Sequence, residues 1–146
     1  MQANDAETVH DIYGRTSQTA FCFLIEFNGT PIGECWLQRM NIPEVKAMYD
    51  NTLDVRRIDM AVFEKDHWNR GIGTQLITML VDFAFGDEHA DVLHVIVGDY
   101  NLRSIRTFEK NGFVEVARIP TNEAAKQSEE IHLALTCEEY FTRFTA

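Results

Sequence analysis

The sequence predicts an α/β fold, in which a mixed β-sheet carries helices on its faces. Two observations lead to this prediction. Short apolar runs that are typical of strands alternate along the chain with segments whose apolar residues recur at helical spacing. One run, residues 91–97, is almost continuously apolar, as expected for a strand in a sheet that is covered on both sides. The expected order of elements is therefore α-β-β-β-α-β-α-β-β.

Length and composition indicate one globular unit. The chain has 146 residues, of which 45% are hydrophobic and 25% charged, so residues 1–146 are expected to form a single domain. With 13 Lys and Arg against 23 Asp and Glu, the net charge is −10, which argues against a nucleic-acid partner and favours a cationic one. Three cysteines without Cys-x-x-Cys spacing favour a reducing, cytoplasmic setting. No apolar run reaches the roughly 18 residues that cross a bilayer, so no membrane partner is expected.

Six strands are expected, over about residues 20–27, 32–40, 54–63, 91–97, 113–119 and 131–135. The first two are joined by Asn28-Gly29, a dipeptide that favours a type I′ hairpin turn because both residues tolerate a positive φ. Between the second and third strands, Pro43 indicates a loop or a short helix.

Three helices are expected. Asn4 or Asp5 can cap the first, which ends near Tyr13. The second begins directly after Gly71-Ile72-Gly73, where apolar residues recur every four positions as far as Ala84.

The third helix begins after Asn101, a capping residue, and its inward face is expected to hold Leu102, Ile105 and Phe108. Gly112 is expected to end this helix in a left-handed conformation, with Phe113 as the accompanying hydrophobic contact.

The strongest chemical signal is the turn that leads into the second helix. Its glycines let the backbone bend so that several N–H groups point the same way, and the helix N-terminus adds about half a positive charge. Such a turn suits a phosphate or pyrophosphate, and Arg70 can add a charge-assisted contact. A Walker loop is excluded because no Gly-Lys-Ser/Thr follows, and the dinucleotide fingerprint fails at Leu76. Taken alone, Gly-x-Gly before a helix is a plain tight turn more often than a phosphate site.

Two motifs in order resemble the GNAT superfamily of acetyl-CoA-dependent N-acetyltransferases. Gly71-Ile72-Gly73, after a strand that ends in Met60-Ala61-Val62, matches the Gln/Arg-x-x-Gly-x-Gly/Ala signature. Residues 101–113 match Asn-x-x-Ala-Ile-x-x-Tyr-x-Lys-x-Gly-Phe. The likeness covers about residues 32–135. Within the superfamily, Arg57-Ile58-Asp59 and the block 101–106 are most similar to the aminoglycoside 6′-N-acetyltransferases.

The resemblance implies a mostly antiparallel sheet with a V-shaped splay between its central strands and helices on both faces. It implies acetyl-CoA as the co-substrate and direct attack on the thioester by a primary amine of a small cationic acceptor, an aminoglycoside or a polyamine. Two alternatives stay open. One is a protein or peptide N-acetyltransferase, and the other is a non-catalytic acyl-CoA-binding module.

The resemblance also suggests roles for individual residues. Cofactor contacts are expected from the strand end, the glycine turn and the next helix, at Met60, Ala61, Val62, Arg70, Gly71, Ile72, Gly73, Thr74, Asn101 and Arg106. Asn101 also has the plain alternative of capping its helix, and Arg106 that of a solvated charge.

Asp99 and Asp59 are the candidate catalytic bases, and Glu34 and Asp59 the candidate acceptor contacts. Asp99 alternatively serves as a surface turn residue, and Asp59 as the ion-pair partner of Arg57 or Arg56. No metal is expected, because the histidines show no ligand spacing.

Three departures from the family pattern stand out. Trp68 replaces the usual Gln or Arg, and Phe108 replaces the Tyr that is usually proposed as general acid. A strand and a helix that normally precede the hairpin are expected to be missing, which makes the domain N-terminally short. An exposed sheet edge at that position favours a homodimer formed by edge pairing.

Overall fold

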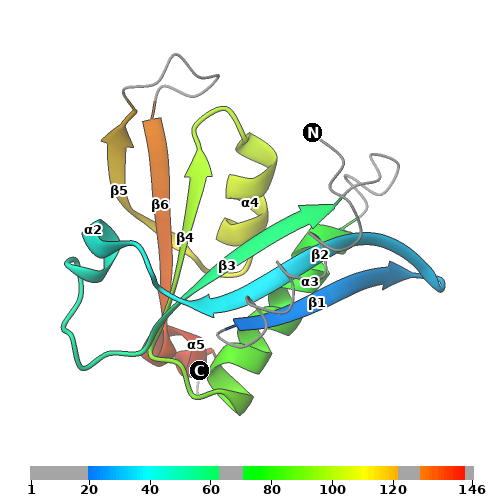
Figure 1. The fold of residues 1–146 in the computed structure, drawn as a ribbon, viewed down its shortest axis with the longest axis horizontal. Coiled ribbons are helices and arrows are strands. Elements are labelled where there is room, and N and C mark those ends of the chain that lie inside the picture. The colour runs from blue at the N-terminus through cyan, green and yellow to red at the C-terminus, as the bar shows by residue number, and fades with distance from the viewer. Residues whose placement is uncertain (1–19, 63–70, 122–128, 144–146) are drawn as a thin grey trace, which may run out of the picture.

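The computed structural model describes residues 20–62, 71–121 and 129–143. The helix expected before Tyr13 lies outside these residues, as do Trp68 and Arg70. Six strands form one sheet in the order β1-β2-β3-β4-β6-β5 (Figure 1). Their bounds are β1 Ala20–Phe27, β2 Thr30–Arg39, β3 Val55–Val62, β4 Val92–Gly98, β5 Val114–Pro120 and β6 Glu129–Thr136. All neighbouring strands are antiparallel except β3 and β4, which confirms the mixed, mostly antiparallel sheet.

The two central strands pair over a short stretch only. The parallel register of β3 and β4 links Val55 with Val92, Arg56 with Leu93, and Arg57 with His94. Beyond Arg57 the two strands diverge (Figure 1). There β3 remains paired with β2 as far as Val62, and β4 with β6 as far as Gly98. The expected V-shaped splay is therefore present, and the sheet leaves the facing edges of β3 and β4 unpaired within the described residues.

The first hairpin has the predicted turn. Asn28 and Gly29 have φ values of 53° and 79°, so both adopt the left-handed conformation that a type I′ turn requires. The loop around Pro43 contains the short helix α2, Pro43–Lys46.

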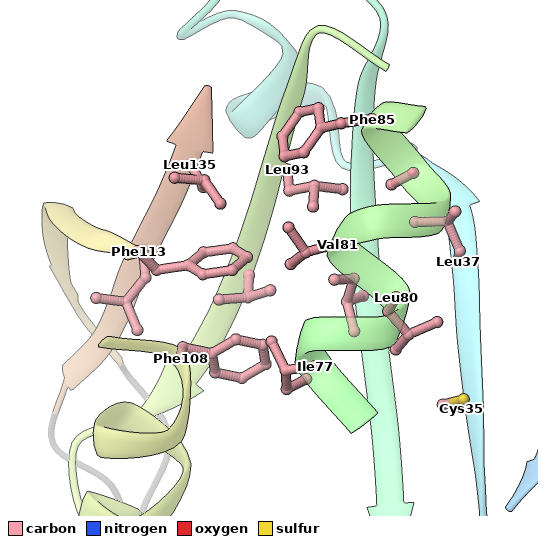
Figure 2. Packing of buried hydrophobic residues seen from close by; sticks show 14 of the residues in the cluster. Cys35, Leu37, Ile77, Leu80, Val81, Phe85, Leu93, Phe108, Phe113 and Leu135 are labelled. Atoms are coloured by element: carbon pink, nitrogen blue, oxygen red, sulfur yellow. The ribbon is translucent and has the colours of Figure 1, made fainter. Parts of the chain in front are cut away.

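The longest helix is α3, Ile72–Asp82, which continues as the π-helical segment η2, Phe83–Asp87. Its predicted apolar face is buried against the sheet, with Ile77, Val81 and Phe85 among the least exposed side chains of the described chain (Figure 2). The π-helical widening was not predicted.

A last helix, α5, spans Cys137–Thr142 and was also missed. The sequence signal for it is a capping box, since Thr136 accepts from the amide of Glu139 and the Glu139 side chain accepts from the amide of Thr136. Its buried Tyr140 stacks on Phe85, with ring centroids 5.0 Å apart.

Helices cover both faces of the sheet. The main core joins α3, α4 (Leu102–Lys110) and α5 to one face, which includes Leu37, Leu93 and Leu135 (Figure 2). Residues at alternate positions of β3, β4 and β6 project to the other face and pack with Val45 of α2 in a smaller cluster. Below, the second surface is called the face opposite α3.

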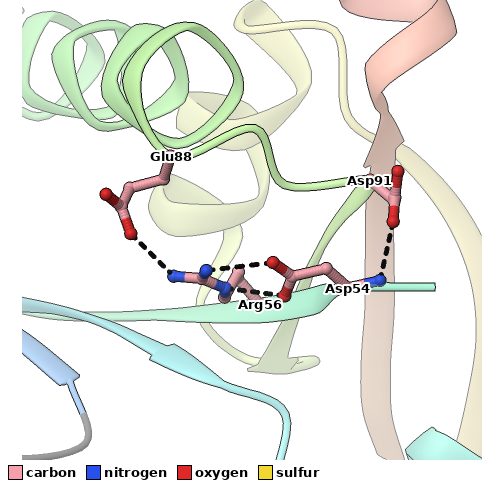
Figure 3. A network of polar contacts seen from close by, with 4 residues as sticks. All are labelled: Asp54, Arg56, Glu88 and Asp91. Carbon is pink, nitrogen blue, oxygen red and sulfur yellow. Dashed lines mark hydrogen bonds and ion pairs between the residues drawn. The ribbon is translucent and has the colours of Figure 1, made fainter. Parts of the chain in front are cut away.

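A polar network holds the closed end of the V together (Figure 3). Arg56 is 8% exposed, donates to both carboxylate oxygens of Asp54 at 2.7 and 2.9 Å, and reaches Glu88 at 3.4 Å. The Asp54 amide donates to Asp91 at 2.8 Å. The start of β3 is thereby joined to the end of η2 and the start of β4.

In the described part of the chain, no helix is long and apolar enough to span a membrane.

Candidate functional site

A cavity of about 840 Å³ lies where the sheet splays open. Its wall is formed by Met60 on the unpaired edge of β3, by the first turn of α3, and by the turn and helix that follow β4. Three segments far apart in sequence thus meet at this cavity, and both sequence motifs contribute to it.

The first turn of α3 presents main-chain N–H groups. Gly71 caps the helix with a φ of 74°, a left-handed conformation that favours glycine, and the first helical hydrogen bond runs from Gln75 N to Gly71 O at 3.0 Å. The amides of Ile72, Gly73 and Thr74 precede that bond and so have no partner within the helix. The first turn holds no acidic residue, so its partial positive charge is not offset there.

Gly73 is not required by packing within the protein. A Cβ atom built at this position would lie 3.6 Å from Thr107 Cγ2, an ordinary van der Waals contact, and its φ is not positive. Because Gly73 lines the cavity, its missing side chain instead gives a ligand close access to the backbone.

The two helices beside the cavity are joined by Asn111, which is 4% exposed. Its side chain donates to the carbonyls of Thr74 and Thr107, both at 3.2 Å, and accepts from Thr78 Oγ1 at 2.7 Å. Sequence reasoning missed this residue. The sequence shows only a polar residue directly before the helix-ending Gly112. Polar residues at helix ends are usually exposed to solvent, so this position does not indicate a buried side chain.

α4 contributes cations to the cavity. Asn101 caps the helix by accepting from the Ser104 amide at 3.3 Å, and it also lines the cavity, so both of its expected roles are compatible. Arg103, Arg106 and Lys110 line the cavity as well. Their spacing of three and four residues places them along one side of the helix.

Leu102 and Phe108, both apolar residues of α4, lie in different surroundings. Leu102, expected to face inward, is 56% exposed, because it occupies the first helical turn at the cavity instead of the core. Phe108 is buried, packs edge-to-face on Phe113 with ring centroids 5.2 Å apart, and reaches the cavity. Gly112 has the predicted positive φ, 92°.

A second polar group lies on the face opposite α3, on the strands that lead to the splay. Asp59 accepts from Arg57 Nη2 and from Gln38 Nε2, each at 2.8 Å. Of the two ion pairs considered for Asp59, the structure contains the one with Arg57, whereas Arg56 pairs with Asp54 and Glu88. Asp59 is the cross-strand partner of Trp36, and Glu34 is that of Ala61. Asp59 and Glu34 are thus near neighbours on the same face.

Asp99 lies at the end of β4, where its amide donates to Glu129 O at 3.0 Å. Its half-buried side chain does not line the cavity, although the next residues, Tyr100 and Asn101, do. The pKa of Arg118 is raised, chiefly by its hydrogen bond with Glu115 and to a smaller extent by the charges of Glu129 and Asp99. Asp99 directly follows β4, whereas Asp59 lies on β3, on the other side of the splay.

A buried chain of hydrogen bonds crosses the base of the V. Tyr49 Oη lies 2.7 Å from His94 Nδ1, and His94 Nε2 lies 2.8 Å from His132 Nδ1. His132 Nε2 is buried 3.6 Å from a carboxylate oxygen of Glu130. Tyr49, His94 and His132 are thus joined by hydrogen bonds within the protein. Over residues 20–62, 71–121 and 129–143, no three His, Cys, Asp or Glu side chains are grouped to hold a metal ion.

Comparison with protein families identifies this arrangement. A model described as "Acetyltransferase (GNAT) family" matches residues 2–113. The chain belongs to the GNAT acetyltransferase family. The splay between β3 and β4 is accordingly that of a GNAT sheet.

Among curated GNAT relatives, the chain is 33% identical to the kanamycin resistance protein of Rhizobium radiobacter over 67 residues, 46% of this chain and 62% of that protein. It is 28% identical to aminoglycoside N(6′)-acetyltransferase type 1 of Klebsiella pneumoniae over 101 residues, 68% of this chain and 50% of that protein. The matched parts thus span between half and about three fifths of these relatives.

Solved structures show the same GNAT fold. Aminoglycoside acetyltransferase AAC(6′)-Ib in complex with coenzyme A superimposes with a TM-score of 0.72 at 22% identity, covering 93% of this chain and 75% of that chain. A spermidine N-acetyltransferase SpeG chimera from Vibrio cholerae and hSSAT superimposes with a TM-score of 0.76 at 15% identity, covering 96% and 84%.

Proposed function

We propose that this protein is an acetyl-CoA-dependent N-acetyltransferase that acetylates a primary amine of a small cationic acceptor. One observation carries the proposal. The cavity combines the open N-terminus of α3, the cations of α4 and the unpaired edge of β3. A pyrophosphate, further phosphate charge and an extended amide chain are the groups that such surfaces bind, and acetyl-CoA carries all three.

The residues fit this co-substrate. The amides of Ile72, Gly73 and Thr74 would hold the pyrophosphate, and Arg106 would add charge. The extended pantetheine arm would pair with the main chain of β3 from Met60 to Val62 as an added strand. A volume of about 840 Å³ lies within the range usual for small-molecule sites. Arg70, which precedes the described part of the turn, remains a predicted contact.

The face opposite α3 would receive the acceptor. Asp59 and Glu34 supply negative charge there beside Trp36, and a chain with net charge −10 attracts cations as a whole. Two curated relatives are named for kanamycin and for aminoglycosides, and one structural neighbour is a spermidine N-acetyltransferase chimera; these names support a polycationic amine as acceptor.

The proposed reaction is direct transfer. The lone pair of the neutral amine attacks the thioester carbonyl carbon, a C–N bond forms, and the C–S bond breaks. The amine proton passes to a base, for which Asp99 is our candidate, directly or through water. The departing thiolate takes its proton from water, because Phe108 offers none. With a pKa near 8.5, a thiol is a good leaving group, so this does not prevent turnover.

Release of CoA thiol from acetyl-CoA, followed with aminoglycosides, polyamines and N-terminal peptides in turn, tests the proposal. Turnover with polycationic amines supports it. Turnover with peptides alone would indicate a peptide N-acetyltransferase, and tight CoA binding without turnover would indicate a binding module.

We also propose a cellular compartment and an oligomeric state for the protein. The free cysteines Cys22, Cys35 and Cys137 support a reducing, cytoplasmic compartment. A homodimer remains our prediction, and sedimentation showing only monomer at high concentration would contradict it.

A further inference from the structure

Both carboxylate oxygens of Asp59 already have partners within the chain. Arg57 holds Oδ1 and Gln38 holds Oδ2, each at 2.8 Å. Asp59 is nonetheless 41% exposed at its side chain and Arg57 26% exposed. The pair is therefore within reach of a molecule that arrives on this face of the sheet.

Arg57 has a second anchor. Its Nη1 donates to Asn41 Oδ1 at 3.0 Å, so the guanidinium lies between a neutral amide and a carboxylate. The ion pair is partly solvated, and pairs of this kind contribute little to stability. A competing cation can consequently take the place of Arg57 at Asp59 while Arg57 keeps its contact with Asn41.

We propose that Arg57 determines acceptor selectivity by occupying, as an internal cation, the carboxylate that a second ammonium group of the acceptor needs. This inference rests on the proposed function and adds to it a residue that restrains acceptor binding. A polyamine or aminoglycoside can displace the guanidinium from Asp59 with an ammonium group remote from the reacting amine. A monoamine has no such group and gains nothing at Asp59.

The test is Arg57→Gln, which removes the charge and keeps a donor for Asn41. With spermidine or kanamycin, KM is expected to fall about two- to fivefold with kcat little changed, since the effect equals that of one partly exposed ion pair. A monoamine should show no such gain. Arg39→Gln is the matched control, because it removes a positive charge from an exposed position at the end of β2. Its KM should stay that of the wild type.

A double variant isolates the pair. In an Asp59→Asn background, Arg57→Gln should not lower KM, because the carboxylate that Arg57 occupies is gone. An unchanged or raised KM in Arg57→Gln would overturn the inference. A fall in KM that Arg57→Gln also causes in the Asp59→Asn background would overturn it as well.

Calorimetry with acetyl-CoA, run on each variant, separates this inference from the proposed function. If the wild-type protein does not bind acetyl-CoA, the proposed function itself is contradicted. Intact acetyl-CoA binding with no gain in spermidine affinity for Arg57→Gln contradicts only the role of Arg57. If no amine is turned over, the dissociation constant of spermidine for the CoA-saturated protein is measured in place of KM. If neither the wild type nor any of the variants binds spermidine, the inference is overturned.

Discussion

The side-chain amide of Asn111 donates a hydrogen bond to the main-chain oxygen of Thr74, 3.2 Å away. Asn111 ends α4, and Thr74 belongs to the first turn of α3, which lines the cavity. The two walls of the cavity are thus held together by one buried side chain, which also accepts from Thr78.

Replacing Asn111 by Ala should therefore affect stability and the site together. The hydroxyl of Thr78 and the carbonyls of Thr74 and Thr107 would each lose a hydrogen bond to Asn111, at a cost of about 1–3 kcal/mol in the free energy of unfolding. Urea unfolding measures that loss, and calorimetry with CoA should show weaker binding. If Asn111→Ala is less stable but binds CoA as tightly as the wild type, the contact stabilises the fold and does not contribute to CoA binding.

Gly73→Ala should separate folding from binding. The helix should keep or gain stability, by about 0.5–1 kcal/mol, because the added Cβ meets only an ordinary contact with Thr107. CoA affinity should fall about tenfold, the loss expected for one hydrogen bond to a charged group. Gly86→Ala is the control, since a Cβ there meets nothing within 4 Å and the residue lies in η2, away from the cavity lining. Equal CoA affinity in both variants would contradict our account of the turn.

The buried histidine pair predicts a loss of stability in acid. Burial lowers the pKa of His94 to about 4, with a smaller contribution from neighbouring His132. An unfolded histidine titrates near 6.5, so between about pH 6.5 and 4 the unfolded chain binds a proton that the folded chain does not. This group's contribution is complete above pH 6.5, and at most about 3 kcal/mol is lost as the pH falls to 4.

Urea unfolding at pH 7, 6 and 5 measures this effect. His94→Gln removes the titrating group, so its free energy of unfolding should be lower at pH 7 but should decline less between pH 7 and 5. Parallel pH dependence in the two proteins would show that His94 is not responsible.

The two aspartates should differ in their kinetics. Asp99→Asn should lower kcat about 10²–10⁴-fold if it removes the base, with little effect on acceptor KM. Asp59→Asn should mainly raise KM for polycationic acceptors, because we propose that its carboxylate binds an ammonium group of the acceptor. Full kcat in Asp99→Asn would mean that water or another residue takes the proton.

Much of this fold follows from local sequence. The Asn28-Gly29 turn, the apolar face of α3 and the Asn101 cap each have a local physical cause, and the structure contains all three. The V-shaped splay entered through the resemblance and not through periodicity, because strand patterns do not say where pairing stops.

What the sequence did not predict depends on long-range contacts. The buried roles of Asn111 and of the His94–His132 pair require partners 33 to 38 residues away in the chain. Leu102 fits an inward helical face by spacing, but it is exposed and lines the cavity beside the first turn of α4. The pairing of Asp59 with Arg57 was foreseen as one alternative, and the additional bond from Gln38 was not.

The most direct test of the central claim is a calorimetric titration of acetyl-CoA into the full chain. Our account predicts one acetyl-CoA per chain, displaced by CoA, with affinity reduced by Gly73→Ala and unchanged by Gly86→Ala. No detectable binding by the folded wild-type protein would contradict the assignment of the cavity between α3 and α4, and with it the proposed acetyl transfer.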